Sequence, residues 1–407
     1  MNPNDTTGEP AAFDIAILGG GLVGTSLACA LDGRGWRIAL VEGAEPRQSP
    51  PGFDDRRLAL ALASLNALEA LDVLPRLAEA PSPIRRIHVS RQGDFGAVRL
   101  EAAQSGLEAF GAVVRASALG AALEARLAAC RGVEVLRPRR VVAMQPVDSG
   151  WTLRLQGPDG ADSITSRLVV GADGTRSFVR NALGIGADEH DYEQVLLVCS
   201  VACDRPADGT AYERFTSQGP VALLPMGRDY GAICGVASDD APRVQSLGDA
   251  DYAAYLQQRF GWRAGRILRV GSRSAYPLAR VVAQALSGRR ALLMGNAAQT
   301  IHPVGAQGFN LGLRDALTFA ERLQQDADPG DPAVLARYVE ARREDRERTL
   351  AFSDGLARAT ASDSAAMHVL RSIGLLALGN VPGLSGPLVS GAMGFRGTVP
   401  QLSRGLR

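Results

Sequence analysis

The chain has 407 residues, of which 46% are hydrophobic and 21% are charged. This is a globular composition, with enough residues for two domains or one large discontinuous domain. The 44 basic and 43 acidic residues give a formal net charge of +1, so no basic excess is available for a polyanion and we do not expect nucleic acid as a partner. All basic residues are arginine, which excludes Schiff-base chemistry and the lysine-dependent phosphate loops of kinases and P-loop ATPases.

The five cysteines are scattered and lie mostly in apolar runs. Cys199 and Cys203 are four residues apart without a second pair nearby in the sequence, so we expect neither a disulfide framework nor a metal site. This usage favours a reducing, cytoplasmic location. The apolar run 15–31 lacks the preceding positive charge of a signal peptide, and prolines in the uncharged stretch 372–395 disfavour a membrane-spanning helix.

The first predicted elements form a βαβ unit. Residues 13–18 are an apolar strand, and residues 19–24 read Gly-Gly-Gly-Leu-Val-Gly and lead into a helix that ends near residue 31. Residues 37–41 are the second strand, which ends at Glu42. A G-x-G-x-x-G pattern between a strand and a helix, followed by an acidic residue after the next strand, is typical of a dinucleotide site.

Each residue of this pattern has a physical role. Gly19 permits the tight turn, Gly21 lets the backbone approach a pyrophosphate, and Gly24 lets the helix pack closely on the strand. The helix N-terminus attracts phosphates. Glu42 would accept hydrogen bonds from ribose hydroxyls and repel a 2′-phosphate, so the pattern indicates an ADP-containing nucleotide, either FAD or NAD.

The middle of the chain alternates between helical and strand-like patterns. Helical apolar spacing is predicted at 58–74 and 118–129, and strands are predicted at 87–90, 97–100, 133–147, 151–155 and through 195–237. The last sixty residues are predicted to be mainly helical. The Arg/Glu-rich run 342–348 is expected to be a solvated helix face.

Two later segments favour FAD over NAD. A buried strand at 168–170 delivers Asp173 and Gly174 to a ligand-facing end. The strand at 292–294 leads through a glycine-containing loop to a helix that begins near Gly308. That helix would aim the positive end of its dipole into the cleft, where it can stabilise the anion of a reduced flavin.

The three segments resemble the aromatic-ring hydroxylase class of FAD monooxygenases, and nearly the whole chain is similar to the ubiquinone-biosynthesis hydroxylases. Further stretches carry this resemblance: 53–56, 87–90, 212–215, 219–225, 260–263 and 273–278. Most of the class has Asp and His where this chain has Asn296 and Gln299. The Asn/Gln pair resembles the branch that acts on 2-octaprenyl-6-methoxyphenol.

The resemblance implies which residues bind FAD. The ADP half would be held by Gly19, Gly21, Gly24 and Glu42, the pyrophosphate or ribityl region by Arg56, and the ribityl chain by Asn296. Asp173 and Gly174 would serve FAD and NAD(P)H. The residues expected at the isoalloxazine are Gly305, Gln307, Gly308 and Asn310, with Arg115 as a further flavin contact.

Several residues carry two interpretations. Asp173 could cap a helix that begins near residue 176, and capping can coexist with ligand binding. His302 could be a structural histidine or a catalytic one, and Pro303 would position the flavin's reactive carbon. Tyr212 and Arg214 could line the substrate cavity or lie on the sheet surface.

The resemblance implies an α/β fold with a Rossmann-like FAD-binding domain of the aromatic hydroxylase type and an inserted β-sheet substrate domain. We expect the discontinuous FAD-binding domain at 12–80, 107–185 and 272–345, the substrate domain at 81–106 and 186–271, and a helical C-terminal region at 346–407.

The implied activity is hydroxylation of a polyprenyl methoxyphenol in ubiquinone biosynthesis, with FAD, with NADPH or NADH as electron donor, and with O2. Three alternatives stay open: hydroxylation at another ring position of the pathway, a flavin-dependent prenyl reductase, and a non-catalytic flavoprotein subunit of a quinone-biosynthesis complex. The prenyl tail implies a protein peripheral to the inner face of the cytoplasmic membrane. The run 367–395 would contact the membrane or a partner, or else pack on the protein's own core.

Overall fold

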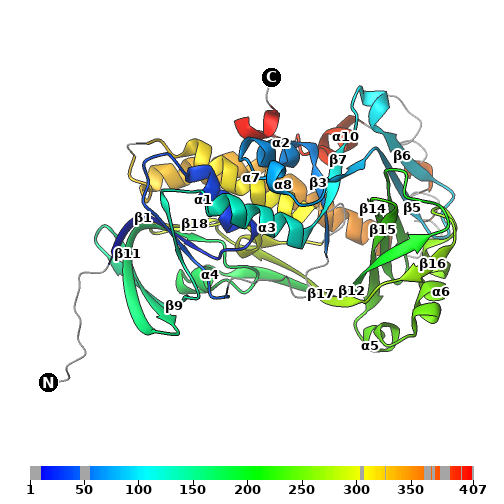
Figure 1. Cartoon of the computed structure of the whole chain (residues 1–407), viewed down its shortest axis with the longest axis horizontal. Coiled ribbons are helices and arrows are strands. Elements are labelled where there is room, and N and C mark those ends of the chain that lie inside the picture. Colours follow the sequence, from blue (N-terminus) through cyan, green and yellow to red (C-terminus); the bar gives the residue numbers. More distant parts are fainter. Residues whose placement is uncertain are drawn as a thin grey trace.

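The computed structural model describes residues 11–45, 56–302, 307–325, 327–361, 368, 372–375, 386–395 and 397–405. Three sheets organise this part of the chain: an eight-stranded sheet, a nine-stranded sheet and a three-stranded sheet between them. Figure 1 shows the eight-stranded sheet at one end of the molecule and the nine-stranded sheet at the other.

The eight-stranded sheet has a parallel core in the order β19-β11-β1-β2-β8. Its strands are β1 (Ala11–Leu18), β2 (Ile38–Val41), β8 (Val133–Leu136), β11 (Gly160–Gly171) and β19 (Ala291–Leu293). The antiparallel strands β9 (Arg140–Val147), β10 (Gly150–Gly157) and β18 (Ser287–Gly288) complete it. The carboxyl end of β1 has β2 on one side and β11 on the other, which is the switch point where parallel α/β sheets bind ligands.

Helices cover this sheet because its central strands are apolar on both faces. α1 (Leu22–Leu31) packs against α3 (Ala116–Leu127) and against α7 (Gln307–Arg322). The long helix α8 (Pro332–Ala361) packs on the outside of α7. One continuous core fills the space between these elements and the sheet.

The nine-stranded sheet runs in the order β20-β17-β12-β15-β14-β13-β5-β6, with β16 paired to β12. Its strands are β5 (Arg86–Arg91), β6 (Ala97–Glu101), β12 (Ala187–Cys203), β13 (Thr210–Thr216), β14 (Gly219–Met226), β15 (Asp229–Ala237), β16 (Ile267–Val270), β17 (Ser274–Ala283) and β20 (Gln299–Thr300). Helices α5 (Ala241–Gln245) and α6 (Asp249–Phe260) cover its outer face, over a second core.

The inner face of the nine-stranded sheet meets the three-stranded sheet, which consists of β3 (Arg57–Ala61), β7 (Gly111–Arg115) and β4 (Ser82–Ile84). Ala211 and Leu224 on the inner face pack against Ile84 and Val113. α2 (Leu62–Ala70) follows β3 directly. The three-stranded sheet therefore joins the nucleotide side of the molecule to the inner face of the large sheet.

Three sequence-based expectations need correction. Residues 57–61 are strand β3 and not the start of a helix, because their alternating Leu and Ala pair along β7. The predicted strand at 133–147 is divided into β8 and β9, which pair with different neighbours. β12 begins at Ala187, earlier than the predicted 195.

The expected domain division also differs from the strand pairing. β17 was assigned to the FAD-binding domain from residue 272, but it pairs with β12 along most of its length and so belongs to the nine-stranded sheet. The division at 345/346 falls inside α8, which is one continuous helix. This helix packs against α7, which lies within the expected FAD-binding domain.

Candidate flavin-binding site

The glycine turn after β1 packs closely at Gly19 and Gly24 and is open to a ligand at Gly21. Gly19 has a φ of +108°, and a Cβ there would lie 2.4 Å from the carbonyl oxygen of Ala172. A Cβ on Gly24 would lie 2.0 Å from the carbonyl oxygen of Gly19, so neither position tolerates a side chain. A Cβ on Gly21 would meet none of the described atoms within 4 Å. Gly21, which has no side chain to cap α1, thus leaves the helix N-terminus accessible to phosphate.

Glu42 lies beside this turn at the end of β2. One carboxylate oxygen accepts a hydrogen bond from the backbone N–H of Gly20 at 2.7 Å, and the other accepts one from Ala44 at 2.8 Å. The carboxylate is therefore fixed at the edge of the turn. A ribose bound along the turn would meet this carboxylate as a hydrogen-bond acceptor.

Asp173 and Gly174 follow β11, and the backbone of Asp173 lies against the glycine turn. A Cβ on Gly19 would lie 2.9 Å from the Cα of Asp173. The Asp173 carboxylate accepts hydrogen bonds from the Ser177 hydroxyl at 2.6 Å and from the backbone N–H of Val179 at 3.1 Å. The N-cap residue of the short helix α4 (Phe178–Ala182) is Ser177, and Asp173 supports this cap by holding the Ser177 hydroxyl and one backbone N–H of the first turn.

The third segment lies against the first turn of α1. A Cβ on Gly295 would lie 3.1 Å from the Val23 side chain, and the backbone N–H of Met294 donates to the carbonyl of Gly171 at 3.0 Å. Asn296 is exposed, whereas Gly295 and the residues 297–299 are buried. The glycine turn, the Asp173 strand end and the Asn296 loop thus converge at one place, and the polar side chain in the last of them is accessible.

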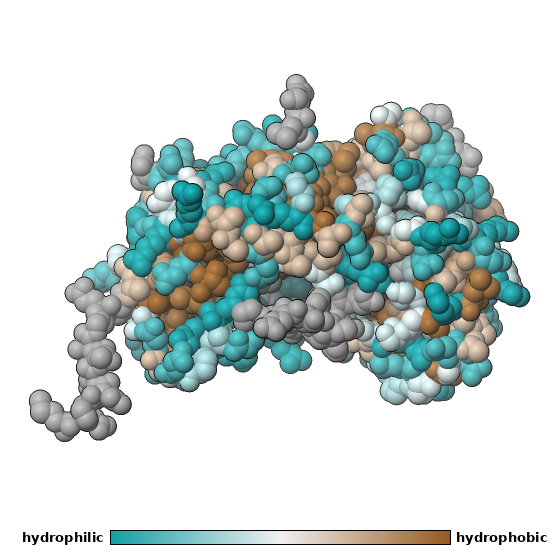
Figure 2. All heavy atoms as spheres, in the orientation of Figure 1, coloured by the Kyte–Doolittle hydropathy of each residue, from teal (hydrophilic) through white to brown (hydrophobic). Residues whose placement is uncertain are grey.

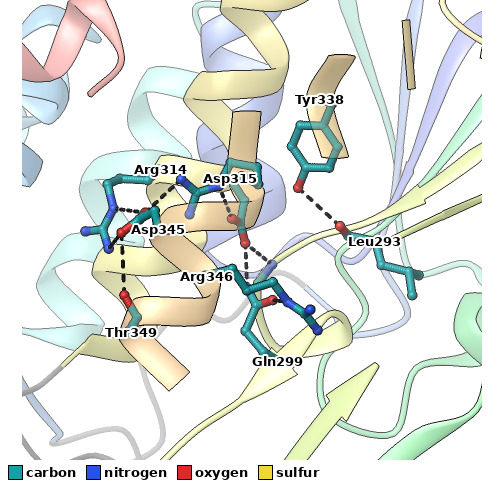
Figure 3. Close-up of polar contacts among 10 residues, drawn as sticks. Leu293, Gln299, Arg314, Asp315, Tyr338, Asp345, Arg346 and Thr349 are labelled. Atoms are coloured by element: carbon teal, nitrogen blue, oxygen red, sulfur yellow. Dashed lines mark hydrogen bonds and ion pairs between the residues drawn. The ribbon is translucent and has the colours of Figure 1, made fainter. Parts of the chain in front are cut away.

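A buried network of charged residues holds this loop on the helices (Figure 3). Asp315 of α7 accepts hydrogen bonds from the backbone N–H of Gly295 at 3.1 Å and from the Gln299 amide at 2.7 Å. The Gln299 carbonyl oxygen accepts from the Arg346 guanidinium at 2.9 Å. Arg342 donates to Asp315 at 2.7 Å and lies 2.7 Å from Asp345. This network fixes the backbone on both sides of Asn296.

The network corrects the expectation for residues 342–348. Arg342 is 0% exposed, because it points between α8 and α7 toward Asp315 and Asp345. The expectation of a solvated face holds for Arg343 and Arg348, which pair with Glu340 and Glu344 at the surface.

The first turn of α7 contains Gln307, Gly308 and Asn310. The Asn310 side chain accepts from the backbone N–H of Ala61 at 3.0 Å and from the Ser64 hydroxyl at 2.7 Å, and its amide donates to the carbonyl of Ala59 at 2.9 Å. Asn310 therefore docks the start of α7 on β3 and α2. Pro303 and Gly305 lie outside the described residues.

The start of β3 joins the nucleotide side to the inner face of the nine-stranded sheet. The Arg56 guanidinium lies 5.4 Å from the centre of the Tyr276 ring on β17. Arg57 lies opposite Arg115 in the antiparallel register of β3 and β7. Its guanidinium donates to the Ser200 hydroxyl of β12 at 2.6 Å. The Arg115 guanidinium lies 3.4 Å from Glu79. Arg57 is buried, and sequence reasoning missed it because nothing in the local pattern separates it from Arg56.

Tyr212 and Arg214 point to the outer face of the nine-stranded sheet. Tyr212 lies opposite Leu223 in the core under α6, and its ring centre is 5.5 Å from that of Phe260. Arg214 donates to the carbonyl of Arg259 at 3.2 Å. Burial raises the pKa of Tyr212 and lowers that of Arg214. Both side chains therefore pack under α6, which is neither the cavity lining nor the sheet surface that the sequence suggested.

His302 lies in an aromatic and acidic cluster at the end of the Asn296 loop. Its ring centre is 4.9 Å from that of Tyr192, edge to face, and the Tyr192 hydroxyl donates to Asp354 at 3.2 Å. Burial lowers the pKa of His302 to about 4, although the nearby Asp354 carboxylate acts in the opposite direction. His302 is therefore neutral at pH 7.

The fold and the converging loops define an FAD-binding flavoprotein of the aromatic hydroxylase type. The family described as "FAD binding domain" matches residues 12–353. Among solved structures, the p-nitrophenol 4-monooxygenase PnpA of Pseudomonas putida superimposes with a TM-score of 0.77 at 19% identity, over 95% of this chain and 99% of that one.

Two relatives of higher sequence identity show which family within this class the chain belongs to. The ubiquinone hydroxylase UbiL of Rhodospirillum rubrum is 35% identical over 97% of this chain and 92% of its own length. The 3-demethoxyubiquinol 3-hydroxylase of Escherichia coli K12 is 30% identical over 91% of this chain and 95% of its own length. The chain belongs to the FAD-dependent ubiquinone-biosynthesis hydroxylase family.

The described residues lack two features. None of the helices in these ranges is long and apolar enough to cross a membrane. Within the same ranges, His, Cys, Asp and Glu side chains do not gather in a group of three that could hold a metal ion.

Proposed function

We propose that this monooxygenase hydroxylates a polyprenyl methoxyphenol ring in ubiquinone biosynthesis, with NADH or NADPH as electron donor and O2 as the oxygen source. The observation that best supports this function is the convergence of the glycine turn, the Asp173 strand end and the Asn296 loop, in a chain similar to UbiL along nearly its whole length.

The proposed cofactor contacts follow from the geometry. Gly21 and the N-terminus of α1 bind the pyrophosphate, Glu42 binds the ribose, and Asn296 binds the ribityl chain. Arg56 and Gly174 would add cofactor contacts, and Gln307 and Gly308 would present the N-terminus of α7 to the ring. Bound FAD supplies the activation of O2 and the transfer of oxygen to the substrate.

The proposed substrate surface is the inner face of the sheet between β12 and β17. Leu196 lies opposite Tyr276, and Val198 lies opposite Ser274, so these side chains share the face that Arg57 contacts at Ser200. This face offers apolar contact for a ring and exclusion of water. The buried Arg57 guanidinium would stabilise the phenolate form of the substrate, which is the form activated toward an electrophilic oxygen.

Isotope labelling tests the reaction. The purified FAD-loaded protein is supplied with NADH or NADPH, with a prenylated 6-methoxyphenol and with 18O2. Incorporation of one 18O atom into the ring supports the proposal, and the position of the new hydroxyl identifies the ring carbon. Consumption of the nicotinamide without 18O in the product would indicate the prenyl-reductase alternative, and bound FAD without turnover would indicate the flavoprotein subunit.

A glycine substitution tests the cofactor contact separately. Gly21→Ala should weaken FAD binding at least about tenfold, or about 1.4 kcal/mol, because the new Cβ occupies the pyrophosphate path and lies within 4 Å of none of the described atoms. Gly120→Ala on α3 is the matched control, since its Cβ would meet only Leu22 at 3.8 Å. Equal FAD affinity for the two variants, measured by fluorescence titration, would contradict the contact.

We also propose that the end of the molecule with the nine-stranded sheet contacts a membrane surface during substrate uptake. Phe95 is 71% exposed and Trp262 is 66% exposed, and Arg263 is exposed next to Trp262. Figure 2 shows hydrophobic atoms among hydrophilic ones at this end. Exposed aromatic side chains beside arginine suit an anionic bilayer interface.

Vesicle binding tests this proposal. The double variant Phe95→Ser/Trp262→Ser should co-sediment less with vesicles containing anionic phospholipid, whereas Val142→Ser, which replaces a 42% exposed residue of the other sheet, should bind as the wild type does. Unchanged binding by the double variant would contradict the surface. Binding only in the presence of other quinone-biosynthesis proteins would assign the surface to a protein partner instead.

A further inference from the structure

Gly231 of β15 is the point where the Arg57 side chain crosses the inner face of the nine-stranded sheet. A Cβ on Gly231 would lie 2.3 Å from the Cγ of Arg57 and 3.2 Å from its Cβ and Cδ. Gly231 does not adopt the left-handed backbone conformation, so the backbone alone does not demand glycine here. The close approach of Arg57 is what excludes a side chain at this position.

The head of Arg57 lies one strand further along the same row of the sheet. Ser200 on β12 is the register partner of Gly231, and its hydroxyl accepts the hydrogen bond from the Arg57 guanidinium at 2.6 Å. The stem of the side chain therefore lies over β15 and the guanidinium lies over β12. Arg57 is only 6% exposed in this position.

The packing of β3 is consistent with this orientation. Ala59, two residues after Arg57, points to the same side of β3 and packs against the small core cluster that contains Leu224. Leu224 is the register partner of Gly231 on β14. The row across the sheet is thus Leu224, Gly231 and Ser200, and the two small residues leave the room that Arg57 occupies.

The next rows along β12 are apolar. Val198 lies opposite Ile233 of β15, and Leu196 lies opposite Tyr276 of β17. These side chains share the face of Ser200, because successive residues of a strand alternate between faces. Four residues of strand cover about 13 Å, which is enough for a substituted benzene ring. The guanidinium therefore lies at one end of an apolar strip.

This placement suits an anionic atom of a ligand. Arginine stays charged when buried, and its planar donors match an oxyanion. The register partner of Arg57 on β7 is Arg115, a second cation, which lies 3.4 Å from Glu79. Burial reduces the screening by water, so an ionised oxygen near the Arg57 guanidinium would be bound more strongly than at the protein surface.

We propose that Gly231 is a specificity-determining residue, because its missing side chain admits Arg57 and so gives the site a preference for a ring with an ionised oxygen. Ser200 is the positioning residue for the guanidinium. The inference rests on the proposed hydroxylation of a phenol, and it adds how the ring is recognised. The substrate binds as phenolate, and a neutral ring of the same shape binds more weakly.

A series of substrate analogues tests this preference. The FAD-loaded protein is titrated at pH 7.5, without nicotinamide, with 2-methoxyphenol and with analogues whose ring fluorines lower the pKa of the phenol. The change in flavin absorbance measures Kd. The most acidic analogue should bind at least about tenfold more tightly than 2-methoxyphenol, because a larger fraction of it is phenolate. Equal Kd values across the series would overturn the proposal.

A double-mutant cycle assigns the preference to the contact between Gly231 and Arg57. Each single change, Arg57→Ala or Gly231→Ala, should reduce the tenfold ratio to less than about threefold, since the first removes the guanidinium and the second displaces it. In the Arg57→Ala protein no Cγ lies near residue 231, so adding Gly231→Ala should change Kd by less than about twofold. A Gly231→Ala protein that keeps the wild-type ratio would refute the role of Gly231.

The matched control is Gly248→Ala, at an exposed position before α6. A Cβ on Gly248 would meet only Asp251, at 3.8 Å, so this variant should keep the wild-type ratio. Ser200→Ala should lower the ratio while FAD affinity stays that of the wild type, because the guanidinium loses a hydrogen-bond acceptor. An unchanged ratio would remove Ser200 from the proposal.

A folding measurement covers the case in which Gly231→Ala destabilises the protein. The yield of folded, FAD-loaded protein should then recover in Arg57→Ala/Gly231→Ala, because the clash is with Arg57. A double variant that stays unfolded would contradict the close approach. Since Kd is measured without turnover, a labelling experiment that gave no 18O in the ring would contradict the proposed hydroxylation and leave this test of phenolate binding unaffected.

Discussion

The two faces of α8 carry the same kinds of residues at the same distances, but their surroundings differ. Arg342 lies 2.7 Å from Asp315 and from Asp345, and all three side chains are at most 2% exposed. Arg343, the next residue, also lies 2.7 Å from its partner Glu340, but both side chains are more than 60% exposed. An ion-pair distance alone therefore does not say what a pair contributes.

Burial decides the difference. An exposed pair exchanges hydration for a weak, screened attraction, whereas a buried charge that loses its partner keeps the full desolvation penalty. The Asp315 and Asp345 charges raise the pKa of Arg342 against the effect of burial, so Arg342 stays ionised. Since Asp315 also binds Gly295 and Gln299, the buried face of α8 supports the flavin loop, and the exposed face does not.

Breaking the buried cluster should have the largest effect. Arg342→Met leaves Asp315 and Asp345 without the guanidinium between them and should cost about 3–5 kcal/mol of unfolding free energy. The midpoint of urea unfolding, followed by flavin and tryptophan fluorescence, measures this loss. An unchanged midpoint would mean that Gly295 and Gln299 satisfy Asp315 and that Arg314 satisfies Asp345.

Cutting the cluster from the flavin loop should have the next largest effect. Gln299→Leu removes the hydrogen bonds to Asp315 and from Arg346, and bonds to charged groups contribute about 1.5–3 kcal/mol each. We expect a loss of about 2–3 kcal/mol in unfolding free energy and a weaker FAD affinity. Gln156→Leu, at an exposed position of β10, is the control. Normal FAD affinity in the Gln299 variant would show that the loop holds its shape without this contact.

His302 is a buried group that, unlike Arg342, is neutral in the folded protein. Burial lowers its pKa to about 4, whereas an unfolded histidine titrates near 6.5, so between these values the unfolded state binds more protons. The part of the unfolding free energy that depends on neutral His302 is therefore fully present above pH 6.5, and it is lost as the pH falls toward 4. At pH 4.5 the unfolding free energy should be about 2.5 kcal/mol lower than at pH 7.5.

Urea unfolding at pH 7.5 and pH 4.5 measures that contribution. His302→Asn should show a smaller decrease between the two pH values than the wild type. His190→Asn is the control, since His190 is an exposed residue near the same Tyr192 ring. Equal decreases for the wild type and the His302 variant would place the titrating group elsewhere.

Local patterns predicted the nucleotide side of the fold well, for a physical reason. The βαβ unit and the strand ends at Asp173 and Asn296 depend on neighbours close in sequence, and the convergence of the three segments is confirmed. The expectation of helical spacing from residue 58 was wrong for residues 58–61, because a short run of Leu and Ala suits a helix or a strand, and only the later strand β7 selects the strand.

The buried face of α8 could not be predicted from charge alone, because its partners come from another helix. A spacing signal was nonetheless present. Arg342, Asp345, Thr349 and Ser353 recur at intervals of three and four residues and are all buried, so they form one polar stripe along α8. Only the adjacent Arg314 and Asp315 on α7 turn such a stripe into a buried one. The side-chain direction of Tyr212 and Arg214 likewise depends on strand register, which the sequence left open.

The smallest effect is expected on the exposed face of α8. Arg343→Met leaves Glu340 in water, where it needs no partner, so the unfolding free energy should change by less than about 0.5 kcal/mol. The remaining attraction in the wild type acts through solvent and is screened by salt, so 0.5 M NaCl should remove even that difference. The Arg342→Met loss should persist at the same salt concentration, because ions do not reach a side chain that is 0% exposed. If salt reduced both losses equally, the cluster around Arg342 would have to be open to water, and the contrast between the two faces of α8 would disappear.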